Sequence, residues 1–528
     1  MEWRAASRGW LFFSVFVAIL FTLPLVYIVS TAASEVSEQW QAVSEIVLPQ
    51  MFLNTLLLLL GTLLLTVVFG VSAAWLVANY RFPGRNLFKG GLLLPLAFPT
   101  YILAYIAGGI FDSTGSLRSI LVQLDFIQPD DTWSVHIFNP VVLVVLLSLA
   151  LYPYVYASSL ASFSFQSANF IETAKSLGKN PLKVFLKVGI PLSRPAIFGG
   201  MFLVAMEVLN EYGAVKYFNI KTLTSGIFTT WQLNDLAAAS RLAILLLGFV
   251  VLFVVLEKWS RKNRGYSNNT RTKPIEPFKL KGWQKWGAFV FCLIPFFWGF
   301  VLPFSQLLYW SINQLELFDT KFFIIVWNSI VVAIVIALII VSLAFALTYA
   351  GFFNQGRLSK LGVNFGSFGY AIPGAVVAIG ITSIFTDIDA FTGVGWLSGS
   401  FIALFLAYII RFLAVASNPI EGNMLKIGQS RIEVSRNLGK SSWKTLLLVQ
   451  TPLLKPILVA GVILVTIDIL KELPLTLILR PVNFNTLATR TYDIAQTYES
   501  ADMAAPYALF IVLLSILPLL FVNKLLSK

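Results

Sequence analysis

The chain has 528 residues, of which 57% are hydrophobic and 12% are charged, with a mean hydropathy of +0.80 and a formal net charge of +13. The chain has too few polar residues to cover the surface of a soluble globule of this size. The composition therefore excludes a soluble protein and predicts a membrane protein. The basic residues gather in short loops between apolar runs, a pattern typical of membrane topology rather than of nucleic-acid binding.

Apolar runs long enough to cross a bilayer core, about 20 residues each, recur along the whole chain. The first, over 10–30, follows Arg4 and Arg8 and is too long for a cleaved signal segment, so it predicts a retained helix. The chain is predicted to be an all-α polytopic membrane protein of about twelve spans, near residues 10–30, 51–78, 88–111, 138–161, 191–212, 236–257, 286–310, 322–350, 361–386, 397–417, 452–475 and 503–523.

Loop charges predict the orientation of these spans. Residues 258–285 carry nine Lys and Arg against one Glu, whereas residues 31–50 carry three Glu and no Lys or Arg. Because cytoplasmic loops are enriched in Lys and Arg, the loop over 258–285 is expected in the cytoplasm. Both termini are expected on the same side.

The two halves of the chain repeat each other. Asn54-Thr55-Leu56 matches Asn328-Ser329-Ile330, and Pro99 matches Pro373, both 274 positions apart. Further on, ETAKSLGKNPLKVFLKVGIPLSRP (172–195) matches EVSRNLGKSSWKTLLLVQTPLLKP (433–456), 261 positions apart. Six spans that recur as six in one orientation predict two parallel repeats with a substrate path between them. We expect repeats over 1–260 and 285–528, joined by a cytoplasmic linker over 261–284.

The segment over 172–195, which recurs over 433–456, is polar although its surroundings are apolar. Residues 172–177 predict a short helix that ends at Gly178, since glycine permits a left-handed turn. Residues 183–188 predict a second short helix before Pro191 begins the next span. A loop that only sets orientation is the alternative. Both copies contain a Glu, a Gly six residues later and a Pro thirteen residues after the Gly. This repeated spacing favours two matched surfaces that contact a partner outside the membrane.

This spacing resembles the signature of the integral membrane permeases of ATP-binding cassette (ABC) importers that work with a substrate-binding protein. That signature, the EAA motif, is Glu-Ala-Ala, three residues, Gly, nine residues and Ile-x-Leu-Pro. The resemblance is to the fused two-domain members, covers nearly the whole chain and implies the type I ABC importer permease fold. It also implies that the segment is a coupling helix that docks on an ATPase subunit, with its signature residues at Glu172, Ala174, Gly178, Pro191, Glu433, Gly439 and Pro452.

The same resemblance implies the partners and the location of the chain. The expected partners are two ABC ATPase subunits, an external (periplasmic) binding protein and the lipid bilayer, with no nucleic acid. The expected location is the bacterial inner membrane. The chain itself is expected to be a transport subunit and no enzyme, because Gly439-Lys440-Ser441 lacks the glycine that a Walker A motif needs at position 434, where Val434 stands. We expect no stably bound cofactor, with ATP held by the partner subunits.

Two further stretches, KYFNIKTLTSGIFTTW (216–231) and KELPLTLILRPVNFNTLATRTYDIA (471–495), resemble the ferric-iron permeases. Ferric iron is therefore the expected cargo. Fused permeases for thiamine or phosphonate share the layout and stay as an alternative. An alternative of another class is a proton-coupled secondary transporter, which also often has twelve spans in two parallel halves.

Two carboxylates fall deep within the predicted fifth span of each repeat, four in all. Glu207 and Glu211 follow Pro191 by 16 and 20 residues, and Asp468 and Glu472 follow Pro452 by the same intervals. At about 1.5 Å per residue, the first of each pair lies roughly 24 Å along its helix. Members of an i, i+4 pair share one helix face.

Acidic side chains at this depth usually face a cavity or a partner. The four carboxylates are therefore candidates for a cation path and for transient contact with a hard metal ion. Asn210 and Tyr212 add polar oxygens, and Arg411 is either a counter-ion or a determinant of orientation. Two alternatives stay open, since Lys216, Lys471 and Arg480 could neutralise the carboxylates as structural ion pairs, or the carboxylates could contact the binding protein.

Overall fold

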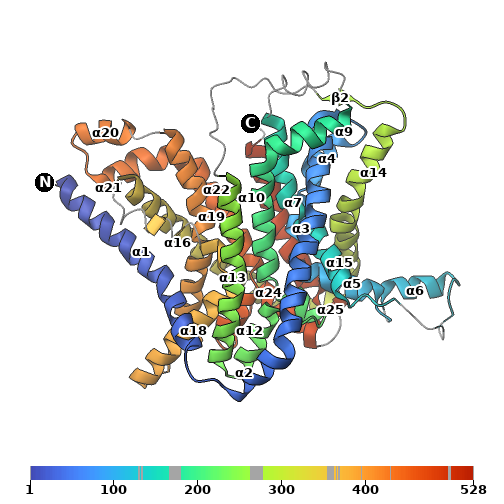
Figure 1. Ribbon diagram of the computed structural model, residues 1–528, viewed down its shortest axis with the longest axis horizontal. Helices are drawn as coiled ribbons and strands as arrows, with labels where there is room; N and C mark the ends of the chain where they lie inside the picture. Colours follow the sequence, from blue (N-terminus) through green and yellow to red (C-terminus); the bar gives the residue numbers. More distant parts are fainter. Residues whose placement is uncertain are drawn as a thin grey trace. The chain divides into compact units, whose positions relative to one another are not determined.

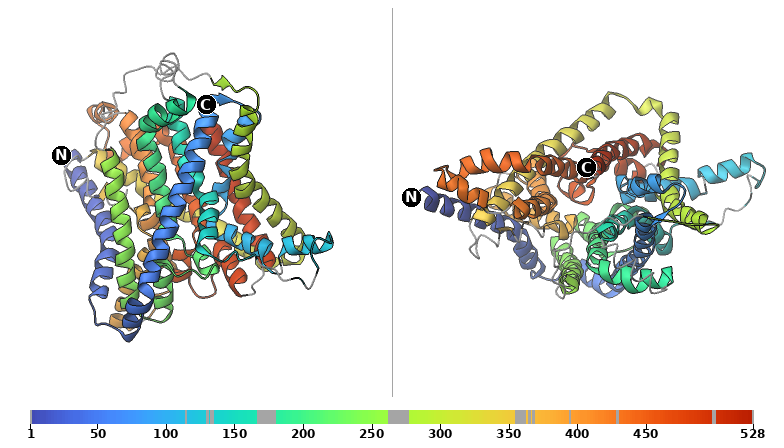
Figure 2. Two further views of the ribbon diagram at one scale, coloured as in Figure 1. Left: turned by 45° about the vertical axis from the view of Figure 1, so that its right-hand side comes forward. Right: turned by 90° about the horizontal axis from the view of Figure 1, so that it is seen from above.

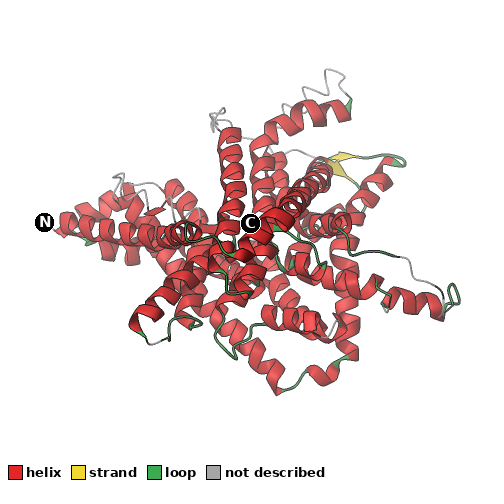
Figure 3. Ribbon diagram, turned by 60° about the horizontal axis from the view of Figure 1, so that its bottom comes forward, coloured by secondary structure: helices red, strands yellow, loops and turns green. Residues whose placement is uncertain are grey.

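A computed structural model of the chain describes residues 2–113, 115–128, 131, 135–165, 180–261, 277–353, 362–363, 366, 369–393, 395–427, 430–497 and 501–526. Nearly all regular structure in these ranges is helical (Figure 3). The exception is a parallel pair of two-residue strands, β1 (Tyr80–Arg81) and β2 (Phe278–Lys279). Most of the predicted linker lies outside the described residues.

The helical elements follow one another in two similar series. The first contains α1 (Glu2–Ala32), α2 (Glu38–Ala42), η1 (Val43–Val47), α3 (Leu48–Asn79), α4 (Arg85–Gly91), η2 (Leu94–Ala97), α5 (Thr100–Phe111), α6 (Ser116–Gln123), α7 (Pro140–Phe165), α9 (Pro181–Val184), η3 (Phe185–Gly189), α10 (Ile190–Asn210), α11 (Gly213–Tyr217), α12 (Leu223–Gln232) and α13 (Leu236–Arg261). The second contains α14 (Gln284–Phe296), η4 (Phe297–Val301), α15 (Leu302–Asn313), η5 (Leu315–Leu317), α16 (Thr320–Phe353), η6 (Gly369–Ala371), α18 (Gly374–Thr392), α19 (Phe401–Ile427), α20 (Ser430–Asn437), α21 (Ser442–Thr445), η7 (Leu446–Gln450), α22 (Thr451–Lys471), α23 (Pro474–Leu479), α24 (Leu487–Thr497) and α25 (Ala501–Leu526).

Each predicted span has a helical counterpart in the described part of the chain. Ten helices there are long and apolar enough to cross a membrane, and the bent pair over 85–123 makes an eleventh candidate. The last predicted span corresponds to α25, whose described apolar stretch is the shorter Ala501–Ile516. The prediction of an all-α polytopic membrane protein is confirmed.

The third predicted span is not a straight helix. Over 85–123 the chain turns by 90° between α4 with η2 and α5 with α6. Pro95 and Pro99 explain the break, because proline has no N–H to donate to the preceding turn. Phe98, the residue before Pro99, is extended with ψ of 120°, as a residue before proline prefers. The span predicted near 88–111 is therefore made of two helical parts that meet at a bend.

The fifth span of each repeat starts earlier than predicted. A single helical run extends over 181–210 in the first repeat and over 442–471 in the second. Each contains one π-helical turn, η3 or η7, in which the N–H of Ile190 or Thr451 bonds to the carbonyl five residues back. The wider turn accommodates the proline that follows. The prediction of a separate short helix before Pro191 was therefore wrong.

The contacts among described residues divide the chain into two compact units that interleave the sequence repeats. Unit 1 comprises 1–45, 226–247 and 318–490, and unit 2 comprises 46–225, 248–317 and 491–528. Within unit 1, α1 of the first repeat packs against α16 and α18 of the second (Figure 1). Within unit 2, α14 and α15 of the second repeat pack against α3, α4 and α5 of the first (Figure 2). The repeats thus exchange their first spans. The repeat boundaries at 260 and 285 stay a prediction.

Small residues allow close helix contacts inside each unit. In unit 1, a Cβ atom added at Gly380 of α18 would lie 2.7 Å from the backbone oxygen of Pro24 in α1. In unit 2, a Cβ atom at Gly70 of α3 would lie 2.9 Å from the backbone oxygen of Tyr152 in α7. Such backbone approach is a common mode of helix packing in membranes. These contacts hold α18 against α1 in unit 1 and α3 against α7 in unit 2.

Candidate functional site

The second copy of the duplicated segment forms a helix, a left-handed turn and a second helix. Glu433 lies on α20, and the turn that follows is closed by hydrogen bonds from the N–H of Gly439 to Arg436 O (3.0 Å) and of Lys440 to Ser435 O (3.1 Å). Gly439 has φ of 72°, which glycine adopts at little cost. The left-handed turn that was predicted at Gly178 is present at Gly439, the matching residue of the second copy. In the first copy, Glu172, Ala174 and Gly178 lie outside the described residues.

Side chains join α20 and α21 to the long helices of unit 1. Ser435 Oγ lies 2.8 Å from Thr445 Oγ1, and this hydrogen bond ties α20 to α21. The Trp10 indole N–H of α1 donates to Ser442 Oγ at 3.0 Å, and the Tyr349 hydroxyl of α16 donates to the Ser442 carbonyl at 3.1 Å. The Trp10 ring centroid lies 4.9 Å from that of Trp443. The first span of one repeat therefore braces the duplicated segment of the other.

The outer face of α20 is mixed in character and accessible. Its buried residues are Ile432 and Ser435, while Glu433 and Arg436 are exposed. Val434 is 57% exposed, and Leu438 in the following turn is 73% exposed. Charged groups beside exposed apolar side chains are typical of a surface that receives a partner.

The described part of the first copy has the same construction from α9 onward. Asn180 Oδ1 accepts the N–H of Leu182 at 3.1 Å, and Ser441 caps α21 in the matching position. The Trp75 ring of α3 lies 5.2 Å from that of Phe185 in η3. Pro191 and Pro452 each occupy the second position of their long helix. Both long helices are therefore anchored at the end where the duplicated segment enters.

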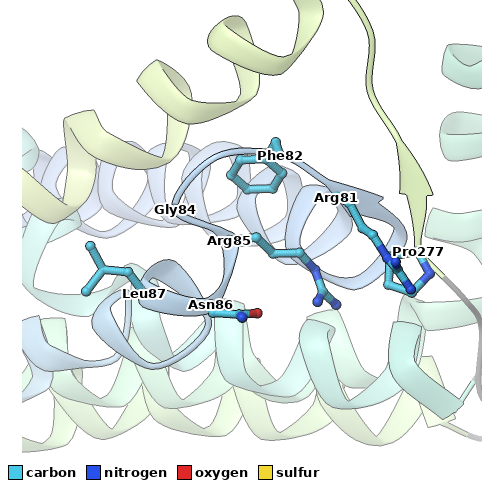
Figure 4. A pocket seen from close by; sticks show the side chains of 7 residues that line it. All are labelled: Arg81, Phe82, Gly84, Arg85, Asn86, Leu87 and Pro277. Atoms are coloured by element: carbon cyan, nitrogen blue, oxygen red, sulfur yellow. The ribbon is translucent and has the colours of Figure 1, made fainter.

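A basic pocket of about 460 Å³ lies beyond the C-terminal end of α3 (Figure 4). Arg85 Nε donates to the Val77 carbonyl of α3 at 2.8 Å, which holds this side chain at the pocket wall. The pocket was not predicted from the sequence, because its wall joins the short connection after α3 to the start of β2. It is lined by Arg81, Phe82, Gly84, Arg85, Asn86, Leu87 and Pro277.

The four carboxylates predicted for the fifth spans do not form two i, i+4 helical pairs. Glu207 and Asp468 are half-buried on α10 and α22. Those helices end at Asn210 and Lys471, so Glu211 and Glu472 lie just beyond them in extended backbone. The predicted shared helix face was wrong, because each helix ends one residue before the second member of the pair.

Glu211 is held by groups of unit 2. Its side chain is 8% exposed, and Oε1 accepts the N–H of Ala214 at 2.7 Å. Oε2 accepts a hydrogen bond from Thr100 Oγ1 at the start of α5. Asn210, directly before it, is also buried. The Tyr212 hydroxyl lies 3.0 Å from that of Tyr492. Asn210 and Tyr212, the polar residues predicted beside the first pair, thus flank a buried carboxylate in the sequence.

Glu472 is held by groups of unit 1, including a cation. Oε1 accepts the N–H of Leu475 at 3.1 Å, and Oε2 lies 3.1 Å from Arg411 Nε. Arg411 is 3% exposed and also donates to the Ile372 carbonyl at 3.0 Å. Of the two roles considered for Arg411, the structure shows the contact of a counter-ion.

No group of three or more His, Cys, Asp and Glu side chains that could hold a metal ion occurs among the described residues. That search covers each described part of the chain. Transient metal contact at Glu207, Glu211, Asp468 and Glu472 therefore stays a prediction.

The matched Asn-Thr and Asn-Ser pairs have a structural role that sequence comparison did not reveal. Thr55 Oγ1 on α3 accepts the N–H of Leu223, and Ser329 Oγ on α16 accepts the N–H of Leu487, at 3.1 and 2.8 Å. These two leucines begin α12 and α24. The recurrence of the Asn-Thr and Asn-Ser pairs in both halves was the available signal. Its structural meaning could not be predicted, because it depends on how helices far apart in the sequence pack.

Paired series of apolar helices with a duplicated polar segment define a multi-pass membrane protein built from two related halves. The sequence model of one protein family, "Binding-protein-dependent transport system inner membrane component", matches residues 66–262 and 343–528, one match in each repeat. The chain belongs to this family, as a fused permease of an ABC importer. The family assignment decides against the secondary-transporter alternative.

Similarity to individual relatives extends along different fractions of the chain. The Fe(3+)-transport system permease protein FbpB 2 of Haemophilus influenzae is 25% identical over 480 residues, which cover 89% of this chain and 89% of that protein. The sulfate transport system permease protein CysT of Salmonella typhimurium is 29% identical over 259 residues, which cover 47% of this chain and 91% of that protein. The molybdenum transport system permease protein ModB of Escherichia coli is 25% identical over 203 residues, which cover 37% of this chain and 86% of that protein.

Proposed function

We propose that this chain is the permease subunit of an ABC importer for ferric iron in a bacterial inner membrane, with both termini in the cytoplasm. An external binding protein delivers the iron, and two separate ATPase subunits bind ATP and dock on the two duplicated segments. ATP binding turns the path outward and hydrolysis returns it inward. ATP must contact the two states differently, because equal binding to both shifts no population.

One observation carries the choice of cargo. The relative named for Fe(3+) transport aligns with 89% of this chain and of its own length, so it shares the fused two-repeat layout. The relatives named for sulfate and molybdenum align with less than half of this chain. Carboxylates on both fifth-span helices, Glu207 and Asp468, add support, because carboxylate oxygens suit hard cations.

The second candidate is a permease for an oxyanion. It is favoured by the family relationship to permeases named for sulfate and molybdenum transport. Uptake into vesicles that contain the complete transporter decides between the two. Binding proteins loaded with ⁵⁵Fe(III), ³⁵S-sulfate or ⁹⁹Mo-molybdate are supplied in turn. Only the iron-loaded protein is expected to support ATP-dependent uptake, and uptake of an oxyanion alone would replace iron as the cargo.

Removal of charge from the half-buried carboxylates is expected to slow iron entry. In the variant Glu207→Gln with Asp468→Asn, both side chains keep their size but lose their attraction for a trivalent cation. We expect uptake to fall by about tenfold, equivalent to about 1.4 kcal/mol. The measurement is the initial rate of ⁵⁵Fe uptake per transporter. Glu421→Gln, on α19, serves as the control, and an unchanged rate in the double variant leaves Glu207 and Asp468 structural.

Loss of the exposed carboxylates of the duplicated segments is expected to weaken ATPase binding. Glu433 is exposed on α20, and Glu172 holds the matching place in the sequence. The double variant Glu172→Ala with Glu433→Ala should retain less ATPase on affinity purification, and each single variant should retain an intermediate amount. Glu316→Ala, outside both segments, is the control. Complexes as complete as the wild type count against the docking role.

A further inference from the structure

Glu211 and Glu472 occupy the same place in the two repeats and make the same backbone contact. Each is the first residue after its long helix, with φ and ψ of −70° and 117° at Glu211 and −68° and 121° at Glu472. Each Oε1 accepts the N–H three residues further on, from Ala214 or from Leu475. Helix N-cap side chains make the same kind of hydrogen bond, and here it comes from the residue just before the N-cap residue, Tyr212 or Leu473. It ties each carboxylate to the first turn of the short helix that follows, α11 or α23.

The second oxygen of each carboxylate has a different donor. In the first repeat the donor is the neutral hydroxyl of Thr100, and in the second it is the cationic guanidinium of Arg411. The sequence repeat explains the difference. Gly374 stands at the position that matches Thr100, and Ala150 stands at the position that matches Arg411. Each repeat therefore has one of the two donors and lacks the other.

Both donors connect the carboxylate to the beginning of the third-span helix. Thr100 is itself the first residue of α5. Arg411 Nη1 donates to the carbonyl of Ile372, two residues before α18 begins at Gly374. Two breaks in the helical structure, one after the fifth-span helix and one before the third-span helix, are thus joined through one carboxylate in each repeat.

We propose that Glu211 and Glu472 are positioning residues that hold these two breaks together and do not ligate the cargo. Both oxygens of each carboxylate already accept a hydrogen bond, and both side chains are more than nine-tenths buried. The first repeat needs a hydrogen-bond acceptor at position 211 but no charge. In the second repeat, Glu472 and Arg411 can be replaced only together, because replacing one of them leaves the other as an unpaired buried charge, which destabilises the fold. This inference deepens the proposed transport function and rests on it for the assay.

The test in the first repeat compares Glu211→Gln with Glu211→Leu. Glutamine keeps an acceptor for the Ala214 N–H, whereas leucine leaves that N–H and the Thr100 hydroxyl unpaired. Cargo uptake per transporter in the membrane, and cargo transported per ATP hydrolysed, are measured in vesicles that contain the complete transporter. We expect Glu211→Gln to stay within about twofold of the wild type and Glu211→Leu to fall by about tenfold or more.

The test in the second repeat is a rescue. Glu472→Gln and Arg411→Gln each leave one buried ion without its partner, so each should reduce uptake by about tenfold or more. The double variant Glu472→Gln with Arg411→Gln contains no buried ion and keeps both hydrogen-bonding side chains, and it should recover to within about threefold of the wild type. A carboxylate that ligated the cargo would not be rescued by removal of its neighbour.

The outcome is separable from that of the proposed cargo. The wild type is first assayed with ⁵⁵Fe(III), ³⁵S-sulfate and ⁹⁹Mo-molybdate, and all variants are then compared with the cargo that it carries. Failure with iron removes the ferric assignment and leaves the comparison of variants intact. The positioning role is overturned if Glu211→Gln is as impaired as Glu211→Leu at equal membrane levels, or if the double variant is no better than its parents.

Discussion

Trp10→Ala is expected to destabilise the protein by about 3–5 kcal/mol, the usual cost of truncating a buried tryptophan. Trp10 is 5% exposed and contacts Tyr349 and Trp443 through its ring. It also donates a hydrogen bond to Ser442. Because these partners belong to the other repeat, uptake per transporter should fall together with stability. Thermal unfolding of the purified protein and vesicle uptake measure the two effects.

Two variants separate the parts of this contact. Trp10→Phe keeps an aromatic ring but loses the donor to Ser442, and is expected to cost about 1 kcal/mol. Trp283→Ala removes a tryptophan that is 81% exposed, and is expected to change stability by no more than about 0.5 kcal/mol. If Trp10→Ala unfolds at the wild-type temperature, α1 does not brace the duplicated segment.

Gly439→Val is expected to uncouple ATP hydrolysis from transport while the protein still inserts into the membrane. A β-branched residue at φ of 72° is strained by about 1–3 kcal/mol, which is enough to reduce the population of the native turn by about 5- to 150-fold. An added Cβ would meet nothing within 4 Å, so the effect arises from the backbone and not from crowding. Cargo transported per ATP hydrolysed is the measurement. By its match in the sequence, Gly178→Val should behave in the same way.

Two controls isolate the backbone conformation. Gly439→Asn should be nearly neutral, because asparagine tolerates the left-handed region better than other residues. Gly422→Val, in α19, also adds a side chain where nothing lies within 4 Å but does not occur at positive φ, and it should leave transport unchanged. Normal coupling in Gly439→Val would remove the requirement for a left-handed turn.

Hydropathy predicted where helices lie because a bilayer demands an apolar run in each span. It did not predict the turn at Pro95 and Pro99, since averaging over a window conceals two prolines in an apolar segment. The π-helical turns before Pro191 and Pro452 were missed for a related reason. Proline near a helix start predicts a boundary, and nothing local shows that a wider turn carries the helix past it.

The candidate site was predictable in its residues but not in its contacts. The duplicated spacing identified Glu433, Gly439 and Pro452, and the depth of the carboxylates identified Glu211 and Glu472. The donors to those carboxylates depend on packing between helices far apart in the sequence. Arg411 was noted because it is charged, whereas Thr100 is neutral and gave no signal.

The exchange of first spans imposes an order on biogenesis. Helix α1 leaves the ribosome early, yet its partners α16 and α18 begin only at Thr320 and Gly374. At about 5–20 residues per second, translation of the intervening chain takes roughly 20–70 seconds. During that time the face of α1 that later packs against Gly380 of α18 lacks this partner. Its apolar sequence makes this waiting state tolerable, and the nascent chain completes unit 2 only when α25 has been synthesised.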